Sequence, residues 1–93
     1  IRLTDERWKH IVENRDDLAG HYYEVLEAVL GPDYVFEGNK DELWAAKFLS
    51  SAKVLLVIYK EDNIRKDGFI LTAFYTTKIK KLLKRKTLWV KQK

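Results

Sequence analysis

The stretch KVLLVIYK at residues 53–60 decides how this chain folds. It is rich in β-branched, aliphatic and aromatic residues, a composition that is typical of a central β-strand. Its strongly apolar part, VLLVIY at residues 54–59, is far too short to cross a membrane as a helix. We therefore expect a central strand at residues 53–60.

Shorter strand patterns flank this central stretch. Residues 34–36 and 43–49 predict two strands joined by a turn at residues 38–41. Residues 61–68 predict a polar hairpin connection to a strand at 68–76, residues 77–85 one or two helical turns, and residues 87–90 a last short edge strand. Strict alternation along residues 68–76 would place Ile70, Thr72, Phe74 and Thr76 on one face and Phe69, Leu71, Ala73 and Tyr75 on the other.

Helical patterns precede the strands. Thr4 is a typical N-cap, because the acidic residues Asp5 and Glu6 follow it in the first turn, and a first helix is expected over about residues 5–13. Asn14 resembles a second cap, and apolar residues recur at helical spacing from residue 18 to residue 29. The second helix is expected to end at the Gly-Pro pair of residues 31–32.

These patterns together predict an α+β fold. Two N-terminal helices would pack on one face of a four-stranded antiparallel β-meander. The chain has 93 residues, of which 46% are hydrophobic and 34% charged, so it can build one core. We expect a single domain over residues 1–93 with a basic C-terminal segment at residues 78–93.

The composition excludes several kinds of site. The chain has no cysteine and only two histidines, so disulfides, thiolate metal sites and cysteine nucleophiles are ruled out. No spacing of histidines and carboxylates indicates a metal centre, and no cofactor is expected. The lack of cysteine and of a signal peptide favours a cytoplasmic protein without a membrane partner. Because the chain has no methionine, we expect that Ile1 is not the translated start.

The charge is distributed unevenly along the chain. The net charge is only +4, but residues 78–93 hold eight bases and no acid, whereas residues 1–67 hold all 14 acids. Apolar residues are interleaved in the basic segment, so it is expected to fold onto a core and hold its charges on a surface. Such a surface is typical of RNA binding, and the alternative is a solvated segment that serves solubility. The bases predicted to contact RNA are Lys47, Lys60, Lys78, Lys80, Lys81, Lys84 and Arg85.

One enzyme class remains open to these residue types. Metal-free cleavage of RNA needs a proton acceptor for the 2′-hydroxyl, a proton donor for the leaving 5′-oxygen, and cations or hydrogen-bond donors around the phosphate. The 2′-hydroxyl is an internal nucleophile that already lies beside the phosphorus atom. A small protein that orients this group can therefore be a catalyst.

His10 is the preferred residue for proton transfer. It lies near the middle of the first helix, offset from the apolar positions, and the alternative is an ordinary surface histidine. Arg15 could clamp a phosphate in a bidentate manner or pair with a neighbouring acid such as Asp16. For His21 a surface or packing role is expected.

The penultimate strand supplies the other candidates. Thr72 and Thr76 offer hydroxyl donors to a phosphate, or are ordinary β-branched strand residues. Tyr75 could stack on a base, form a hydrogen bond through its phenol, or belong to the core. Trp44 and Trp89 could likewise stack on bases or pack against the core.

Several short motifs are similar to those of a known group. The opening LTDERWKHIVE, residues 3–13, has an aromatic residue followed by a helix histidine and two apolar positions. A Pro-Asp pair at residues 32–33, the strands at 54–60 and 69–76, and the basic residues 78–80 follow. Along nearly the whole chain, these motifs resemble the phage-associated nuclease-like domains of the barnase, EndoU, colicin and RelE (BECR) fold superfamily.

The resemblance implies an RNase fold of the RelE/barnase-like type and, often, a toxin or a phage-conflict effector. It places the family's helix histidine at His10 and its strand threonine and aromatic positions at Thr72 and Tyr75. Five residues after the first histidine the family commonly has a second one, and here that position is Arg15. Arginine stabilises charge but does not exchange protons near neutral pH, which leaves His10 without that partner.

We therefore expect a small metal-independent endoribonuclease that cleaves RNA to a 2′,3′-cyclic phosphate. The resemblance makes it a candidate toxin of a toxin–antitoxin pair, with an acidic antitoxin protein as partner. The alternative is a non-catalytic RNA-binding or partner-binding module on the same fold. The sequence leaves the RNA target and the oligomeric state open.

Overall fold

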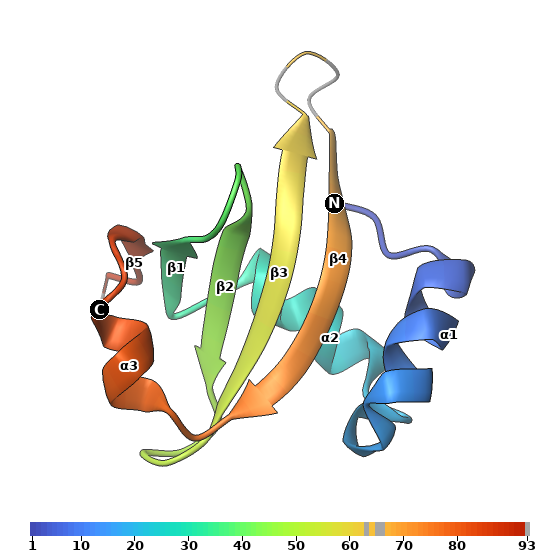
Figure 1. The fold of residues 1–93 in the computed structure, drawn as a ribbon, viewed down its shortest axis with the longest axis horizontal. Helices are drawn as coiled ribbons and strands as arrows, with labels where there is room; N and C mark the ends of the chain where they lie inside the picture. Colours follow the sequence, from blue (N-terminus) through green and yellow to red (C-terminus); the bar gives the residue numbers. More distant parts are fainter. Residues whose placement is uncertain (63, 65–66, 93) are drawn as a thin grey trace.

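The computed structural model describes residues 1–62, 64 and 67–92. In chain order its elements are α1 (Asp5–Asn14), the 3₁₀ turn η1 (Asp16–Leu18), α2 (Tyr22–Leu30), β1 (Tyr34–Glu37), β2 (Leu43–Phe48), β3 (Val54–Asp62), β4 (Asp67–Thr76), α3 (Ile79–Leu83) and β5 (Thr87–Val90). Figure 1 shows α2 behind the sheet, α1 beside β4, and α3 on the opposite side of the molecule near β5. Part of the predicted connection at residues 61–68 lies outside the described residues, as does Lys93.

The strands form one antiparallel sheet in the order β4-β3-β2-β1-β5. The predicted α+β class is confirmed, and β3, which contains the decisive stretch, lies inside the sheet. The predicted number of four strands is wrong, because β5 returns after α3 and pairs with β1 through Tyr34–Val90 and Val35–Trp89. The expected position of β5 at an edge is confirmed, and β4 forms the other edge.

The first helix begins where its cap predicts. The Thr4 hydroxyl accepts a hydrogen bond from the backbone N–H of Arg7 at 3.1 Å, and α1 runs to Asn14. The prediction of one continuous second helix from Asn14 is wrong. Gly20 adopts a φ of 84° in the left-handed region, so the chain breaks between η1 and α2. Within the described residues, no helix has the length and apolarity needed to cross a membrane.

The sheet buries apolar side chains on both faces. On one face α1 and α2 cover the larger cluster, in which Ile11 and Val25 pack with sheet residues such as Leu55 and Val57. On the other face Leu82 of α3 packs with the smaller cluster, made of Phe36, Ala46, Val54 and Leu56. The second face is covered by a helix of only five residues, which leaves part of it accessible.

A β-bulge interrupts the pairing of β3 with β4. Thr72 pairs with Ile58, but the next residue of β3, Tyr59, pairs with Ile70, so Leu71 is an extra residue. Ile70 consequently packs into the same cluster as Ala73, although the two are three residues apart. The predicted strict alternation along residues 68–76 is therefore wrong, since Ile70 does not share the face of Phe74.

The free edge of β4 is only partly covered by the chain. Arg2 forms an isolated parallel bridge with Phe69, and its backbone N–H donates to the carbonyl of Gly68 at 2.7 Å. This short contact shields the N-terminal end of β4. The remainder of the edge, from the bulge onward, borders α1 and the candidate site.

Candidate functional site

Three of the predicted catalytic residues line one groove. Between α1 and the bulged part of β4 lies a hollow of about 490 Å³, which we call the α1–β4 groove. Its lining residues are Arg7, His10, Ile11, Asn14, Arg15, Leu71 and Thr72. His10, Arg15 and Thr72 come from two separate elements and the segment after α1, and the fold places them along the same groove.

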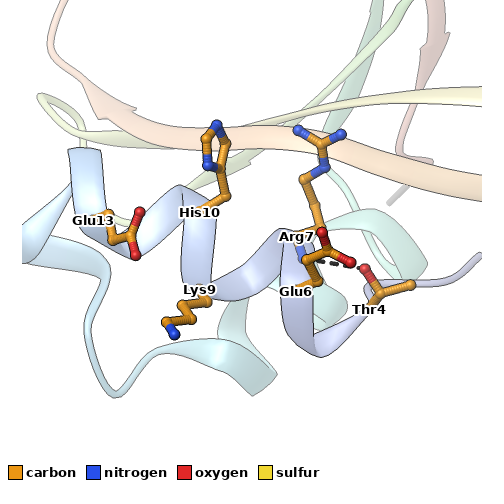
Figure 2. Close-up of a pocket in the computed structure, with 6 residues that line it drawn as sticks. All are labelled: Thr4, Glu6, Arg7, Lys9, His10 and Glu13. Atoms are coloured by element: carbon orange, nitrogen blue, oxygen red, sulfur yellow. Dashed lines mark hydrogen bonds between the residues drawn. The ribbon is translucent and has the colours of Figure 1, made fainter.

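Helical spacing explains which side chains of α1 reach this groove. Positions 7, 10, 11 and 14 lie on one face of a helix because they are three, four and seven residues apart. Figure 2 shows the His10 ring and the Arg7 guanidinium on the same side of α1, whereas Lys9 extends the opposite way. The Asn14 side chain donates to the His10 carbonyl at 3.2 Å. Sequence reasoning missed Arg7 and Asn14, although their spacing from His10 was a usable signal.

A second hollow on α1 shares two residues with the groove. It has a volume of about 500 Å³ and is lined by Thr4, Glu6, Arg7, Lys9, His10 and Glu13 (Figure 2). Arg7 and His10 line both hollows, so the exposed His10 lies between a hollow that contains Glu6 and Glu13 and a groove that contains no acid. Glu13, one helical turn after His10, places a carboxylate in that hollow.

Arg15 lies at the rim between the two sides of β4. Its guanidinium carbon is 5.4 Å from the centre of the Phe74 ring, at a distance typical of a cation–π contact. Phe74 belongs to the apolar cluster on the α3 face of the sheet. Arg15 therefore lines the α1–β4 groove and reaches around the strand edge towards the other face.

Tyr75 and Thr76 do not join His10. The Lys53 amine lies 4.4 Å from the centre of the Tyr75 ring, and the His21 ring packs edge-on against it. Burial, followed by the negative charges of Asp17 and Glu24, raises the pKa of the Tyr75 phenol. Tyr75 thus belongs to a cluster beside α2, where its phenol stays protonated near neutral pH.

Thr76 lies at the end of β4, in a different hollow. Its hydroxyl accepts a hydrogen bond from the backbone N–H of Lys78 at 3.1 Å. It lines a groove of about 290 Å³ between β4 and α3, which we call the β4–α3 groove. The lining residues of this groove are Trp44, Leu56, Phe74, Thr76, Lys78, Lys81, Leu82 and Arg85.

The predicted RNA-binding bases fall into separate places. Lys78, Lys81 and Arg85 line the β4–α3 groove, and Lys80 and Lys84 are exposed on or next to α3. Lys47 instead donates to the carbonyl of Gly31 at 3.2 Å, where it caps the end of α2. Lys60 is half-buried on β3 and pairs with Phe69.

The bases of the two grooves keep their charge available. No base that lines either groove forms an ion pair with an acid among the described residues. The linings of both grooves contain bases and no acid, and such a lining attracts phosphate groups with an affinity that falls steeply as salt rises. Elsewhere in the described part of the chain, no three histidine or acidic side chains cluster in a way that could hold a metal ion.

Comparison of the chain with models of protein families, with curated proteins and with solved structures found no match. The function is therefore argued from the two grooves.

Proposed function

We propose that this protein is a metal-independent endoribonuclease whose reaction centre is the α1–β4 groove. The observation that carries the proposal is the convergence of His10, Arg15 and Thr72 on this groove. An exposed imidazole, guanidinium groups and a hydroxyl line the same hollow. These are the group types that cleavage of RNA by its own 2′-hydroxyl requires.

In the proposed reaction, the 2′-oxygen of the ribose forms a bond to phosphorus and the bond from phosphorus to the 5′-oxygen breaks. The products are a 2′,3′-cyclic phosphate and a 5′-hydroxyl end. One protein group takes the proton from the 2′-hydroxyl and another gives a proton to the leaving oxygen. His10 carries out one of these transfers, and we assign the other to Glu13, which lines the hollow that His10 shares.

The cations of the groove have a different task. Negative charge grows on the non-bridging phosphate oxygens as the transition state forms, and fixed positive charge stabilises it. Arg7 and Arg15 supply this charge, with Thr72 as a hydroxyl donor. The bulge at Leu71 turns β4 at this point, in keeping with the frequent occurrence of bulges beside active sites.

The order of helices and strands is compatible, at the coarse level of an α+β fold, with the family that the sequence resembles. Two helices that precede an antiparallel sheet are what the resemblance to the barnase, EndoU, colicin and RelE superfamily implies. On that basis the finer assignment to a RelE/barnase-like fold, the role as a toxin, an acidic antitoxin partner and a cytoplasmic location are parts of the proposal.

The test is an RNA cleavage assay in excess chelator. We expect fragments with 2′,3′-cyclic phosphate ends, identified by mass spectrometry, and a loss of about 100-fold or more in rate for His10→Ala. The matched control is His21→Ala, since His21 lies beside Tyr75 and outside the groove. An undiminished rate in His10→Ala would remove this histidine from the mechanism.

A second function, RNA binding without cleavage, is favoured by Arg15. The guanidinium stands where the family commonly has a histidine, and it does not transfer protons near neutral pH. Glu13→Gln separates the two functions, because it keeps the size of the side chain and removes its capacity to exchange protons. Salt-dependent RNA binding with no cyclic phosphate ends under any condition would identify the binding module.

A further inference from the structure

The β4–α3 groove contains an arginine whose guanidinium lies over an aromatic ring. The guanidinium carbon of Arg85 lies 3.9 Å from the centre of the Trp44 ring. Arg85 also donates to the carbonyl of Glu37 at 3.0 Å and to the side-chain oxygen of Asn39 at 3.3 Å. Two hydrogen bonds and one ring contact therefore fix the plane of this guanidinium. A fixed guanidinium plane is a surface on which an unpaired base can stack.

The backbone makes room for the tryptophan. A Cβ atom added at Gly38 would lie only 2.3 Å from the indole nitrogen of Trp44. No side chain can occupy position 38 while the ring stays in place. The indole N–H in turn donates to Glu42 at 3.3 Å, which anchors the polar end of the ring. The loop between β1 and β2 thus holds the ring that supports Arg85.

The surroundings of this pair suit a base with its phosphates. Phe74 adds a second ring to the groove, while Lys78 and Lys81 add two amines. At about 290 Å³, the groove lies near the lower end of the sizes known for small-ligand sites, so it suits one base and not a stack of several. The amines are placed for the phosphates on either side of that base.

The two grooves meet at Phe74. This ring lines the β4–α3 groove, and the Arg15 guanidinium of the α1–β4 groove lies over it. A strand bound with its scissile phosphate near Arg15 would pass Phe74 at the edge of β4 before it reached Lys78 and Lys81. Duplex RNA cannot follow this path with a base in the groove, because its bases are paired and stacked on one another.

We infer that the β4–α3 groove holds one unpaired base of a single-stranded RNA, stacked on the Arg85–Trp44 pair, with Lys78 and Lys81 on the neighbouring phosphates. The inference rests on the proposed function only in that the RNA is the substrate of the α1–β4 groove. It names the substrate class as single-stranded RNA and assigns a binding site outside the reaction centre.

The test measures the binding of strands that cannot be cleaved. A fluorescently labelled ten-nucleotide strand with 2′-O-methyl groups at every position lacks the attacking hydroxyl, so its anisotropy reports binding alone. We expect it to bind about tenfold more tightly than an abasic strand of the same length, and more tightly than its own duplex. Equal affinity for the strands with and without bases would overturn the inference and leave only phosphate attraction.

Two variants assign the effect to the stack. Trp44→Leu and Gly38→Ala are each expected to weaken binding of the base-bearing strand about tenfold while leaving binding of the abasic strand unchanged. Trp89→Leu is the matched control, because Trp89 lies exposed on β5 and does not line the groove. Full affinity in both groove variants would sink the inference.

A third measurement works even if Trp44→Leu fails to fold. In the double variant Trp8→Phe/Trp89→Phe, Trp44 is the sole tryptophan, since the chain has three. Its fluorescence is expected to change on binding the base-bearing strand and to stay constant with the abasic one. Because no cleavage is needed, a protein that binds in this manner but never cuts RNA would contradict the proposed function and uphold this site.

Discussion

The two grooves that border β4 share a positive charge but differ in what they can do to a phosphate. The α1–β4 groove holds an exposed imidazole with two arginines, while the β4–α3 groove holds fixed aromatic and guanidinium planes with two lysines. Histidine is the residue type most often used for general acid–base catalysis, and the β4–α3 groove contains none. The contrast distinguishes the groove proposed as the reaction centre from the groove proposed to hold the RNA strand.

The helices that wall the two grooves are anchored to different extents. Ile11 is the one buried residue among those described in α1, and Leu82 is likewise the one buried residue among those described in α3. Ile11 packs into the larger cluster and Leu82 into the smaller one. We therefore expect α3, the helix beside the β4–α3 groove, to separate from the sheet more easily than α1.

The largest expected effects come from removing these anchors. Ile11→Ala should lower the free energy of unfolding by about 4 kcal/mol, because it leaves a cavity in the main core. Leu82→Ala should cost about 2 kcal/mol and act locally, since α3 has five residues and few neighbours. Urea unfolding gives the totals, and hydrogen exchange shows whether the loss of protection stays within α3. If both variants lost the same unfolding free energy and lost protection throughout the fold, α1 and α3 would not differ in how firmly they are anchored.

The next effect in size concerns Arg7, a lining residue of the proposed reaction centre that only the structure identifies. Arg7→Ala should lower kcat about 100-fold, because one cation facing the developing phosphate charge is lost. Lys9→Ala on the same helix should have little effect, since Lys9 extends away from the groove (Figure 2). Single-turnover kinetics on a short RNA separates kcat from binding. If the two variants lose activity to the same extent, the role of Arg7 is no more than general charge.

A smaller effect should appear in alkaline solution. Burial raises the pKa of Tyr59, with a further contribution from Glu61, and the pKa of Tyr75 is also raised. Both phenols therefore hold their protons more tightly in the folded chain than in the unfolded one, where the pKa is about 10. Their contribution to stability is complete below about pH 10 and is lost as the pH rises through the folded-state values.

Phenylalanine variants test this dependence. Tyr59→Phe and Tyr75→Phe should each flatten the fall in unfolding free energy above about pH 10, and Tyr23→Phe, at an exposed position, should not. Tyr59 belongs to the larger apolar cluster, which α1 and α2 cover, and the partly buried Tyr75 packs against that cluster. Chemical denaturation at a series of pH values provides the measurement, and an identical alkaline slope in all four proteins would contradict it.

The sequence predicts local structure in this chain better than it predicts contacts between residues that are far apart in the sequence. The stretch at residues 53–60 was enough to place β3 inside an antiparallel sheet, because a run of that composition suits few other positions. The return of β5 to β1 depends on pairing between residues more than fifty positions apart, which no local pattern encodes. The break between η1 and α2, by contrast, could have been predicted, because a glycine, Gly20, interrupts the helical pattern there.

The same limit explains the outcome for the site. His10 and Thr72 line one groove because α1 lies along the edge of β4, whereas Tyr75, which the resemblance named together with them, lies beside His21. Thr76 shares the face of Thr72 but lies four residues further on, about 13 Å along an extended strand, and so reaches the other groove. The bulge at Leu71 has no marker such as glycine, so the face of Ile70 could not be derived from alternation.

The smallest expected effect leaves both grooves unchanged. The turn between β1 and β2 has Lys40 and Asp41 at φ values of 45° and 67°, and the N–H of Glu42 donates to the carbonyl of Asn39 at 3.0 Å. Two consecutive residues with positive φ are the mark of a type I′ turn, which favours glycine at its second central position. Asp41→Gly should therefore raise the free energy of unfolding by about 0.5 kcal/mol, and Gly20→Ala, at a φ of 84° with no atom within 4 Å of the added carbon, should lower it by about 1 kcal/mol. Thermal unfolding of both variants provides the comparison. RNA binding by Asp41→Gly should match that of the parent protein, because the backbone of the turn keeps Asn39 beside Arg85. A weakened affinity would mean that the substitution displaces the Arg85–Trp44 pair.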